Sequence, residues 1–230
     1  KYEMYENLHE KLSNFELLLE RHYDPELKIF ADYGKHSTNV KLSSKFIQKN
    51  KNGPKEKVFY QDVKTPPKYQ LVTDSYGYIS LFPLFLEIIP VESPILKETL
   101  HKLYDLDNSN SLWTNFGLRS ISKSSPYYNA KNTEHDPPYW RGPIWVNINV
   151  LTVRALKNYG EKLAEIYGND NDLAIFAKKM YVELKTNIYN TVFKEWKRTG
   201  FIWEQYDDVT GRGKGTRAFS GWSALVIMLE

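Results

Sequence analysis

The stretch PIWVNINVLTVRALKNYG, residues 143–160, decides the fold that we predict for this chain. Its apolar side chains recur at the three- to four-residue period of a helix with one buried face. Pro143 suits the first turn of such a helix, and Gly160 stands where a C-terminal cap belongs. We therefore expect a helix over residues 143–160, with core positions Ile144, Ile148, Leu151, Ala155 and Leu156.

A second periodic stretch follows at residues 172–199. Asn171 or Asp172 is its expected cap, and the Thr199-Gly200 pair is its expected end. The apolar positions of this helix are Phe176, Met180, Leu184, Ile188 and Val192.

Further helices are expected over residues 2–19 and 80–89, after Ser93 as cap, and after Ser220 as cap. The third of these should bury Leu96, Leu100 and Leu103 on one face. Because no series of short strands alternates with the helices, the sequence predicts an all-α architecture with long functional loops.

Two connections between the expected helices are long. Residues 41–68 are rich in Lys and should form a loop or excursion, with a short hairpin at residues 58–63. Residues 109–138 also hold Trp113 and Phe116, which indicates an ordered irregular stretch rather than a linker.

The composition excludes several classes of protein. Hydrophobic residues make up 41% and charged residues 26% of the 230 residues, which excludes a disordered or collagen-like chain. The net charge of +3 is too small to indicate a nucleic-acid partner. Without cysteine, the chain can form no disulfide, zinc–thiolate site or cysteine nucleophile. No apolar run approaches the roughly 20 residues needed to span a membrane.

Both ends of the sequence fall in or near periodic apolar runs. Helical spacing is present from Tyr2 onward without an initiating Met, and the apolar run after Ser223 reaches the last residues. These ends predict a fragment of a longer chain. In such a fragment, residues 2–19 and 225–229 would each expose an apolar helix face that the missing part covers, and we call these two faces seams.

Aromatic residues and carboxylates gather in the expected loops. Trp203, Glu204 and Tyr206 form one cluster, Tyr139, Trp140 and Arg141 belong to a second, and Phe219 and Trp222 to a third. Sugar rings have apolar faces and hydroxyl edges, and glycoside hydrolysis needs two carboxylates across the scissile bond. Glu204 is therefore the candidate catalytic residue. The alternatives are that the tryptophans are core residues and that Glu204 is a solvated glutamate.

Other site chemistries have weaker support. His135 and Asp136 have no second His at metal-ligand spacing, so we expect no metal. Residues 210–216 contain three glycines but lack the spacing of a phosphate-binding loop. A nucleotide-binding module and a helical scaffold that binds peptides remain the alternatives from other classes.

Several motifs resemble those of the processing α-glucosidases in glycoside hydrolase family 63. They are NTEHDPPYWRGPIW at residues 132–145, FIWEQY at 201–206, and GRGKG at 211–215, followed by FSGW at 219–222. DYGKH at 32–36 and GYISLFP at 77–83 resemble further landmarks in the same order. The resemblance covers nearly the whole chain and is weakest across residues 43–68, which looks like an insertion.

The resemblance implies an (α/α)6 toroid, of which residues 1–230 would be the C-terminal part of the catalytic domain. It implies an exo-acting, inverting α-glucosidase that removes the terminal α-1,2-linked glucose from the glucosylated N-glycan precursor in the endoplasmic reticulum lumen. A bacterial-type family 63 glucosidase with another α-glucoside substrate is the alternative within the family. No cofactor is implied, and a membrane anchor would lie N-terminal to this sequence.

The resemblance also implies the site residues. The family's general base falls on Glu204, and its general acid would lie upstream of residue 1, because no matching acidic motif precedes residues 32–36. We expect the substrate to be bound by residues from all three clusters, namely Asp136, Tyr139, Trp140, Arg141, Trp145, Trp203, Tyr206, Phe219 and Trp222.

Overall fold

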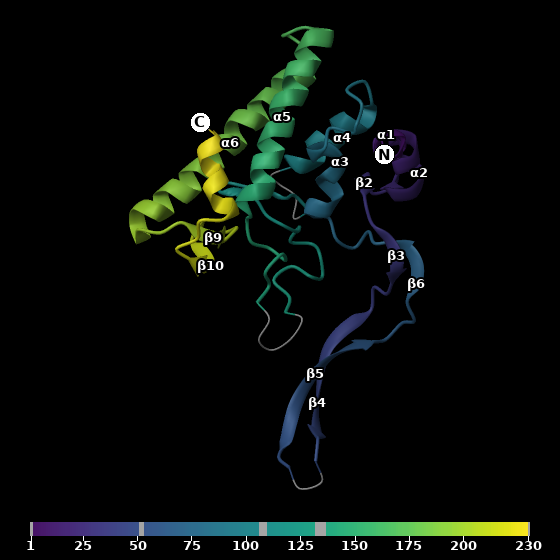
Figure 1. Ribbon diagram of the computed structural model, residues 1–230, viewed down its shortest axis with the longest axis vertical. Helices are drawn as coiled ribbons and strands as arrows, with labels where there is room; N and C mark the ends of the chain where they lie inside the picture. Colours follow the sequence, from purple (N-terminus) through teal and green to yellow (C-terminus); the bar gives the residue numbers. More distant parts are fainter. Residues whose placement is uncertain (1, 51–52, 106–109, 132–136, 230) are drawn as a thin grey trace.

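Two long helices form the centre of the computed structural model, which describes residues 2–50, 53–105, 110–131 and 137–229. Helix α5 (Val146–Tyr167) and helix α6 (Asp172–Thr199) run antiparallel and pack side by side (Figure 1). Their apolar stripes meet in the core, as their periodicity predicts. Buried residues in this interface region include Ile148, Leu156, Leu163, Ala177, Met180 and Leu184.

Both ends of α5 differ from the prediction. The helix begins at Val146, with Trp145 at the cap position, so Pro143 and Ile144 lie before the helix rather than in its first turn. Gly160 lies inside the helix, which continues to Tyr167 and ends at Gly168 with a φ of 97°. A Cβ atom at Gly160 would lie 3.0 Å from the Cγ of Lys178 on α6. Gly160 therefore permits the close approach of the two helices, and its role is in packing rather than capping.

The ends of α6 are as predicted. The Asn171 side chain caps the helix by accepting the backbone N–H groups of Leu173 and Ala174 at 3.0 and 3.1 Å. Gly200 ends it in the left-handed conformation, with a φ of 78°. Glycine adopts this conformation without the steric cost that a Cβ atom imposes.

The N-terminal helices are shorter than predicted. The expected helix over residues 2–19 is two helices, α1 (Tyr2–Leu12) and α2 (Phe15–His22), because Asn14 begins a new helix by capping Leu17 N–H at 2.9 Å. The prediction of one helix over residues 80–89 is wrong as well. The segment is a 3-10 turn (η1, Tyr78–Leu81) and one turn of α-helix (α3, Phe82–Phe85), and the chain then reaches a positive φ at Glu87.

Helix α4 (Pro94–Leu103) confirms its prediction, with Ser93 as cap and Leu96, Leu100 and Leu103 fully buried. The last predicted helix, expected after Ser220 as cap, differs from its prediction. Residues Trp222–Leu229 form a 3-10 helix, η2, and among the described residues the side chain of Ser220 makes no capping hydrogen bond to it. None of the helices in the described ranges combines the length and the apolar character that a membrane span requires.

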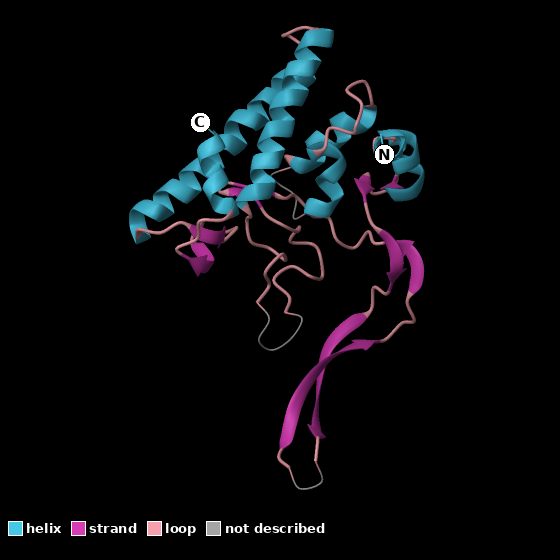
Figure 2. Ribbon diagram, in the orientation of Figure 1, coloured by secondary structure: helices cyan, strands magenta, loops and turns pink. Residues whose placement is uncertain are grey.

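Short strands accompany the helices (Figure 2), and some of their residues, such as Phe30, Trp113 and Tyr206, belong to the hydrophobic core. The all-α expectation is therefore only partly correct. Each sheet found in the described part of the chain has two antiparallel strands. The pairs are β1 (Tyr23–Asp24) with β2 (Ile29–Phe30), β3 (Tyr33–His36) with β6 (Lys68–Leu71), β4 (Val40–Gln48) with β5 (Lys55–Val63), β7 (Trp113–Thr114) with β8 (Gly117–Leu118), and β9 (Trp203–Tyr206) with β10 (Gly213–Arg217).

The β4–β5 hairpin extends away from the helices (Figure 2). Its register runs from Val40 opposite Val63 to Gln48 opposite Lys55, so it is much longer than the hairpin expected at residues 58–63. A strand signal is present in β4, where Val40, Leu42 and Phe46 are separated by polar residues, whereas the apolar residues of β5 stand together at residues 58–60.

The loops that lead into α5 and out of α6 meet at one end of the helix pair (Figure 1). Isolated bridges connect Arg119 to Ile144, and Ile144 to Tyr206. The buried amide of Asn149 on α5 adds hydrogen bonds to both backbone groups of Leu118, at 2.7 and 3.2 Å. Strand β9 is therefore fixed against the segment just before α5, and β8 against the first turn of that helix.

Candidate active site

Glu204, on strand β9, is held by hydrogen bonds to both oxygens of its carboxylate. The hydroxyl of Tyr139, in the loop before α5, donates to Oε1, and the backbone N–H of Thr216 on β10 donates to Oε2 at 3.0 Å. Glu204 is only 7% exposed. The fold thus brings together three groups that are distant in the sequence around one buried carboxylate.

Two opposing effects set the charge of this carboxylate. Burial raises the pKa of Glu204, but the hydrogen bonds from Tyr139 and Thr216 together outweigh burial, and the pKa is lowered from its ordinary value. The same contact, together with burial, raises the pKa of Tyr139 to about 12. At neutral pH, Glu204 is ionised and Tyr139 keeps its proton, which is the state that a general base requires.

Glycine at position 215 permits this contact. Gly215 has a φ of 74°, and a Cβ atom there would lie 2.6 Å from Oε2 of Glu204. Any side chain would displace the carboxylate or move β10. Gly215 therefore allows the backbone to approach an acidic side chain, and the sequence did not show that this side chain would be Glu204.

The backbone of Glu204 is fixed as well. Its carbonyl oxygen accepts hydrogen bonds from Nε1 of Trp222 at 2.8 Å and from Oγ of Ser223 at 3.2 Å. Both donors lie at the start of η2. Strand β9 is therefore tied to β10 on one side and to η2 on the other.

Four predicted aromatic residues form one cluster beside this carboxylate. Trp140 stacks on Trp145 with ring centroids 3.6 Å apart and planes 11° apart, and Trp222 lies 5.5 Å from Trp145. Phe219 extends the cluster, 4.7 Å from Trp222. Trp145 is fully buried whereas Trp140 is 44% exposed. Trp140 is thus the ring that offers an open surface, and Trp145 supports it from below.

Trp203 and Tyr206 lie apart from this cluster. The Trp203 ring packs against Gly213, where a Cβ atom would overlap the ring, and its Nε1 donates to Oγ1 of Thr199 at 3.2 Å. Tyr206 is fully buried, and its hydroxyl accepts the Trp203 backbone N–H at 3.3 Å. Tyr206 has no surface for a ligand in this arrangement, and contact of either residue with substrate stays a prediction.

Two predicted substrate-binding residues remain, Arg141 and Asp136, and the structure describes only the first of them. The guanidinium of Arg141 donates through Nη2 to the carbonyl oxygen of Pro137 at 3.2 Å, which stabilises the loop that carries Tyr139 and Trp140. Asp136 lies outside the described residues.

A buried ion pair that the sequence analysis did not single out lies just after β9. Asp208 is 3.0 Å from Nε of Arg119, and the hydroxyl of Tyr128 donates to both of its carboxylate oxygens at 3.1 and 2.8 Å. Burial and this contact raise the pKa of Tyr128 to about 12. Residue 208 comes shortly after the FIWEQY motif, but nothing in the sequence showed which partners it would meet.

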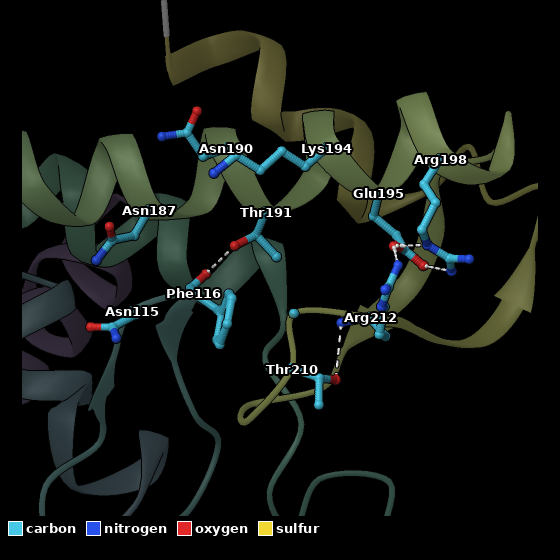
Figure 3. A pocket seen from close by; sticks show the side chains of 11 residues that line it. Asn115, Phe116, Asn187, Asn190, Thr191, Lys194, Glu195, Arg198, Thr210 and Arg212 are labelled. Atoms are coloured by element: carbon cyan, nitrogen blue, oxygen red, sulfur yellow. Dashed lines mark hydrogen bonds and ion pairs between the residues drawn. The ribbon is translucent and has the colours of Figure 1, made fainter.

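Two hollows in the described part of the chain lie near the site, and Glu204 lines neither of them. A cavity of about 280 Å³ lies beside Trp140 and is lined by apolar side chains that include Tyr78, Phe82 and Ile148. A polar hollow of about 410 Å³ lies under α6 (Figure 3). Among the described residues, no cluster of His, Asp and Glu is suited to a metal ion.

A buried, ionised carboxylate beside stacked tryptophans, at the loop end of a helical core, is the arrangement expected of a glycoside hydrolase. The comparisons agree: the model of the glycosyl hydrolase family 63 C-terminal domain matches residues 1–230. The chain belongs to this family.

Relatives in plants and yeasts carry glucosidase names. The chain is 40% identical over 227 residues to mannosyl-oligosaccharide glucosidase GCS1 of Arabidopsis thaliana, covering 99% of this chain and 25% of that protein. It is 36% identical over 152 residues to mannosyl-oligosaccharide glucosidase of Saccharomyces cerevisiae, covering 66% of this chain and 17% of that protein. The chain thus spans about a quarter or less of the length of these relatives.

A solved structure supports the fold. The mannosylglycerate hydrolase of Thermus thermophilus, a family 63 protein, superimposes with a TM-score of 0.51 at 20% identity, over 92% of this chain and 35% of that chain. The likeness concerns the fold alone.

Proposed function

We propose that this chain is the general-base part of an exo-acting, inverting α-glucosidase that removes the terminal α-1,2-linked glucose from the glucosylated N-glycan precursor. The observation that carries the proposal is the ionised Glu204 carboxylate, held by Tyr139 and Thr216 beside the exposed ring of Trp140. The names of the plant and yeast relatives supply the substrate class.

In this reaction Glu204 removes a proton from a water molecule as the water oxygen attacks the anomeric carbon of glucose. The bond from this carbon to the leaving oxygen breaks, and its electron pair goes to that oxygen. A general acid protonates the oxygen at the same time. The water forms its bond opposite the broken one, so the released glucose has inverted configuration.

The general acid is proposed to come from sequence N-terminal to residue 1, about 6.5–9.5 Å from Glu204, as inversion requires. In the same proposal, residues 1–230 form the C-terminal part of an (α/α)6 toroid, and residues 43–68 are an insertion whose strands form most of the projecting hairpin. The site of action is the endoplasmic reticulum lumen, where such a precursor is trimmed.

Substitution of Glu204 tests the proposal directly. In the purified enzyme, Glu204→Gln keeps the hydrogen bond from Thr216 N–H but removes the base, and kcat should fall by about 10²–10⁴-fold. NMR should show that the wild-type enzyme releases glucose with inverted anomeric configuration. A loss of less than about tenfold, or retained configuration, contradicts the assignment.

Ligand binding separates this proposal from the other function classes. Iminosugars of the deoxynojirimycin type should raise the melting temperature of a glucosidase. Stabilisation by nucleotides or by peptides, but not by iminosugars, would favour a phosphate-binding module or an interaction scaffold instead.

A further inference from the structure

The polar hollow under α6 is separate from Glu204 and has no role in the proposed reaction. It lies between the turn at Asn115-Phe116, the turn at Thr210-Arg212 and the C-terminal half of α6, and its volume of about 410 Å³ falls within the range of ligand sites (Figure 3). Thr191 on α6 fixes the turn at Asn115-Phe116, because its hydroxyl donates to the carbonyl oxygen of Phe116 at 3.0 Å. The hollow is therefore built from three connected elements.

Several polar side chains of the hollow are uncommitted. Asn115, Asn190 and Lys194 make no hydrogen bond or ion pair with any residue in the described part of the chain. Asn187 uses only its Nδ2, which donates to the carbonyl oxygen of Thr114 at 3.3 Å. Amides offer both donors and acceptors, which suits the hydroxyl groups of a sugar.

The charged groups at the other end of the hollow are already paired. Glu195 is 3% exposed, accepts two hydrogen bonds from Arg198 at 2.8 and 2.5 Å, and lies 3.5 Å from Nη1 of Arg212. Lys194 is thus the one lining cation without a carboxylate partner in the described part of the chain. The three lining cations outnumber the single lining carboxylate, so the uncommitted amides rather than the charges point to a hydroxyl-rich ligand, and inorganic phosphate is the competing ligand in the test below.

The hollow shares a structural element with the Glu204 site. Glu195 accepts the backbone N–H of Gly213 at 3.0 Å, and Glu204 accepts the backbone N–H of Thr216 at 3.0 Å. The two N–H groups lie three positions apart along β10, at most about 10 Å at about 3.3 Å per residue. One branched oligosaccharide is long enough to contact both sites.

We propose that this hollow is a second carbohydrate subsite, which binds a hexose unit of another part of the same oligosaccharide whose terminal glucose lies at Glu204. The inference rests on the proposed function and extends it. Asn190 and Lys194 contact the hydroxyl groups, and the Phe116 ring, which packs against Gly211, gives the hollow an apolar wall. The subsite adds affinity for large substrates and little for small ones.

The test compares two substrates in the purified enzyme. The combined variant Asn190→Ala/Lys194→Ala removes uncommitted groups of the hollow, and Lys185→Ala removes another α6 cation outside the hollow as control. The ratio of KM for a glucosylated high-mannose oligosaccharide to KM for an α-1,2-linked glucosyl disaccharide should rise about tenfold in the combined variant. The control should leave this ratio within about twofold of wild type.

A parallel binding measurement separates the two proposals. In the Glu204→Gln background, calorimetry should show weaker binding of an unglucosylated high-mannose oligosaccharide when Asn190 and Lys194 are replaced. If hydrolysis is absent in the wild-type enzyme but this difference in binding is present, the proposed function fails and the subsite stands. An unchanged KM ratio, equal effects on both substrates, or displacement of the oligosaccharide by inorganic phosphate would overturn the subsite.

Discussion

The charge of a single carboxyl group depends on where its neighbours lie in space. In Glu204, burial alone would favour the protonated acid, and the donors from Tyr139 and Thr216 reverse that preference. A charge-assisted hydrogen bond is stronger than a neutral one, so each donor has a measurable share in keeping the base ionised.

Tyr139→Phe tests the share of the hydroxyl group. The variant keeps the ring, which meets Trp145 edge-on at 4.7 Å, but removes the donor to Glu204. Without the donor the pKa of Glu204 rises, and the base is protonated at higher pH than before. The acidic limb of the kcat/KM profile should therefore move to higher pH.

The control for this variant is Tyr60→Phe, because Tyr60 lies on the distant hairpin strand β5. Its pH profile should overlay that of the wild type. An acidic limb that is unmoved in Tyr139→Phe would show that the contact with Glu204 does not set the charge of the base.

Gly215→Ala tests the space around the carboxylate, and Gly200→Ala is its matched control. Both glycines have left-handed backbone conformations, with φ of 74° and 78°, so the backbone alone should cost each variant about 1 kcal/mol of stability, and Gly215→Ala adds the cost of its contact with Glu204. A Cβ atom at Gly215 meets Oε2 of Glu204 at 2.6 Å, whereas one at Gly200 meets nothing within 4 Å.

The kinetic effects of the two glycine variants should differ. Displacement of a catalytic group by about 1 Å costs about 10²-fold, so Gly215→Ala should lower kcat by roughly this factor, and Gly200→Ala should not. Equal kcat values at matched thermal stability would contradict the assigned role of Gly215.

At the scale of elements, the long helices and the projecting hairpin contribute differently to the stability of the fold. Helix α6 is buried along one face and begins at an amide cap, whereas the β4–β5 hairpin extends into solvent with Phe46 and Leu42 exposed. A two-stranded ribbon gains little stability alone. The stability of the core should therefore depend on the ends and faces of α5 and α6.

Asn171→Ala removes the α6 cap and leaves the N–H groups of Leu173 and Ala174 without the amide acceptor. It should cost about 1 kcal/mol of unfolding free energy, measured by denaturant titration of the purified enzyme. Asn169→Ala, two residues earlier, removes an exposed contact with Lys178 and should stay within about 0.5 kcal/mol of wild type. Equal losses in the two variants would show that the cap has no special role.

At the scale of the molecule, apolar surface is left open at two places. No residue of α1 is buried, although its exposed face carries Tyr2, Tyr5 and Leu8, and near the other end Ile227 and Met228 are each 70% exposed. Both places lie within the predicted seams at residues 2–19 and 225–229, but Phe15, Leu18 and Leu19 pack against the core and Val226 and Leu229 are buried, so each seam is only partly open. An apolar groove lined by residues that include Leu12, Leu18, Phe82 and Leu86 adjoins the first seam.

Residues 1–230 expressed alone should therefore associate or remain partly folded, because stable monomers rarely expose contiguous apolar patches of more than a few hundred Å². Light scattering after gel filtration measures the association. Hydrolysis of a glucosylated oligosaccharide should be absent, because the proposed general acid is not among these residues. A monodisperse, active monomer would contradict both expectations and direct the search for the acid to Asp32 and Asp136.

The sequence by itself determined the helices whose signals are local. Period, cap and terminating glycine lie close along the chain in α6, and cap and period do so in α4, so both ends of α6 and the start of α4 followed from the chain. Predictions from local sequence were wrong where a contact with a residue distant in the sequence determines the structure. Gly160 resembled a cap because the sequence does not show that Lys178 packs against it. The hairpin expected at residues 58–63 was too short, because the pairing of residues 40–48 with residues 55–63 joins positions that are not adjacent in the sequence.

The kind of chemistry was also visible in the sequence, because Trp, Tyr and Glu stand together in FIWEQY. Only the tertiary structure decided which of them meet. Alternation along β9 separates Trp203 from Glu204, and the partner of Glu204 is a tyrosine 65 positions earlier in the chain. Spacing within a motif cannot specify such a contact, since it exists only when α5, β9 and β10 have packed against one another.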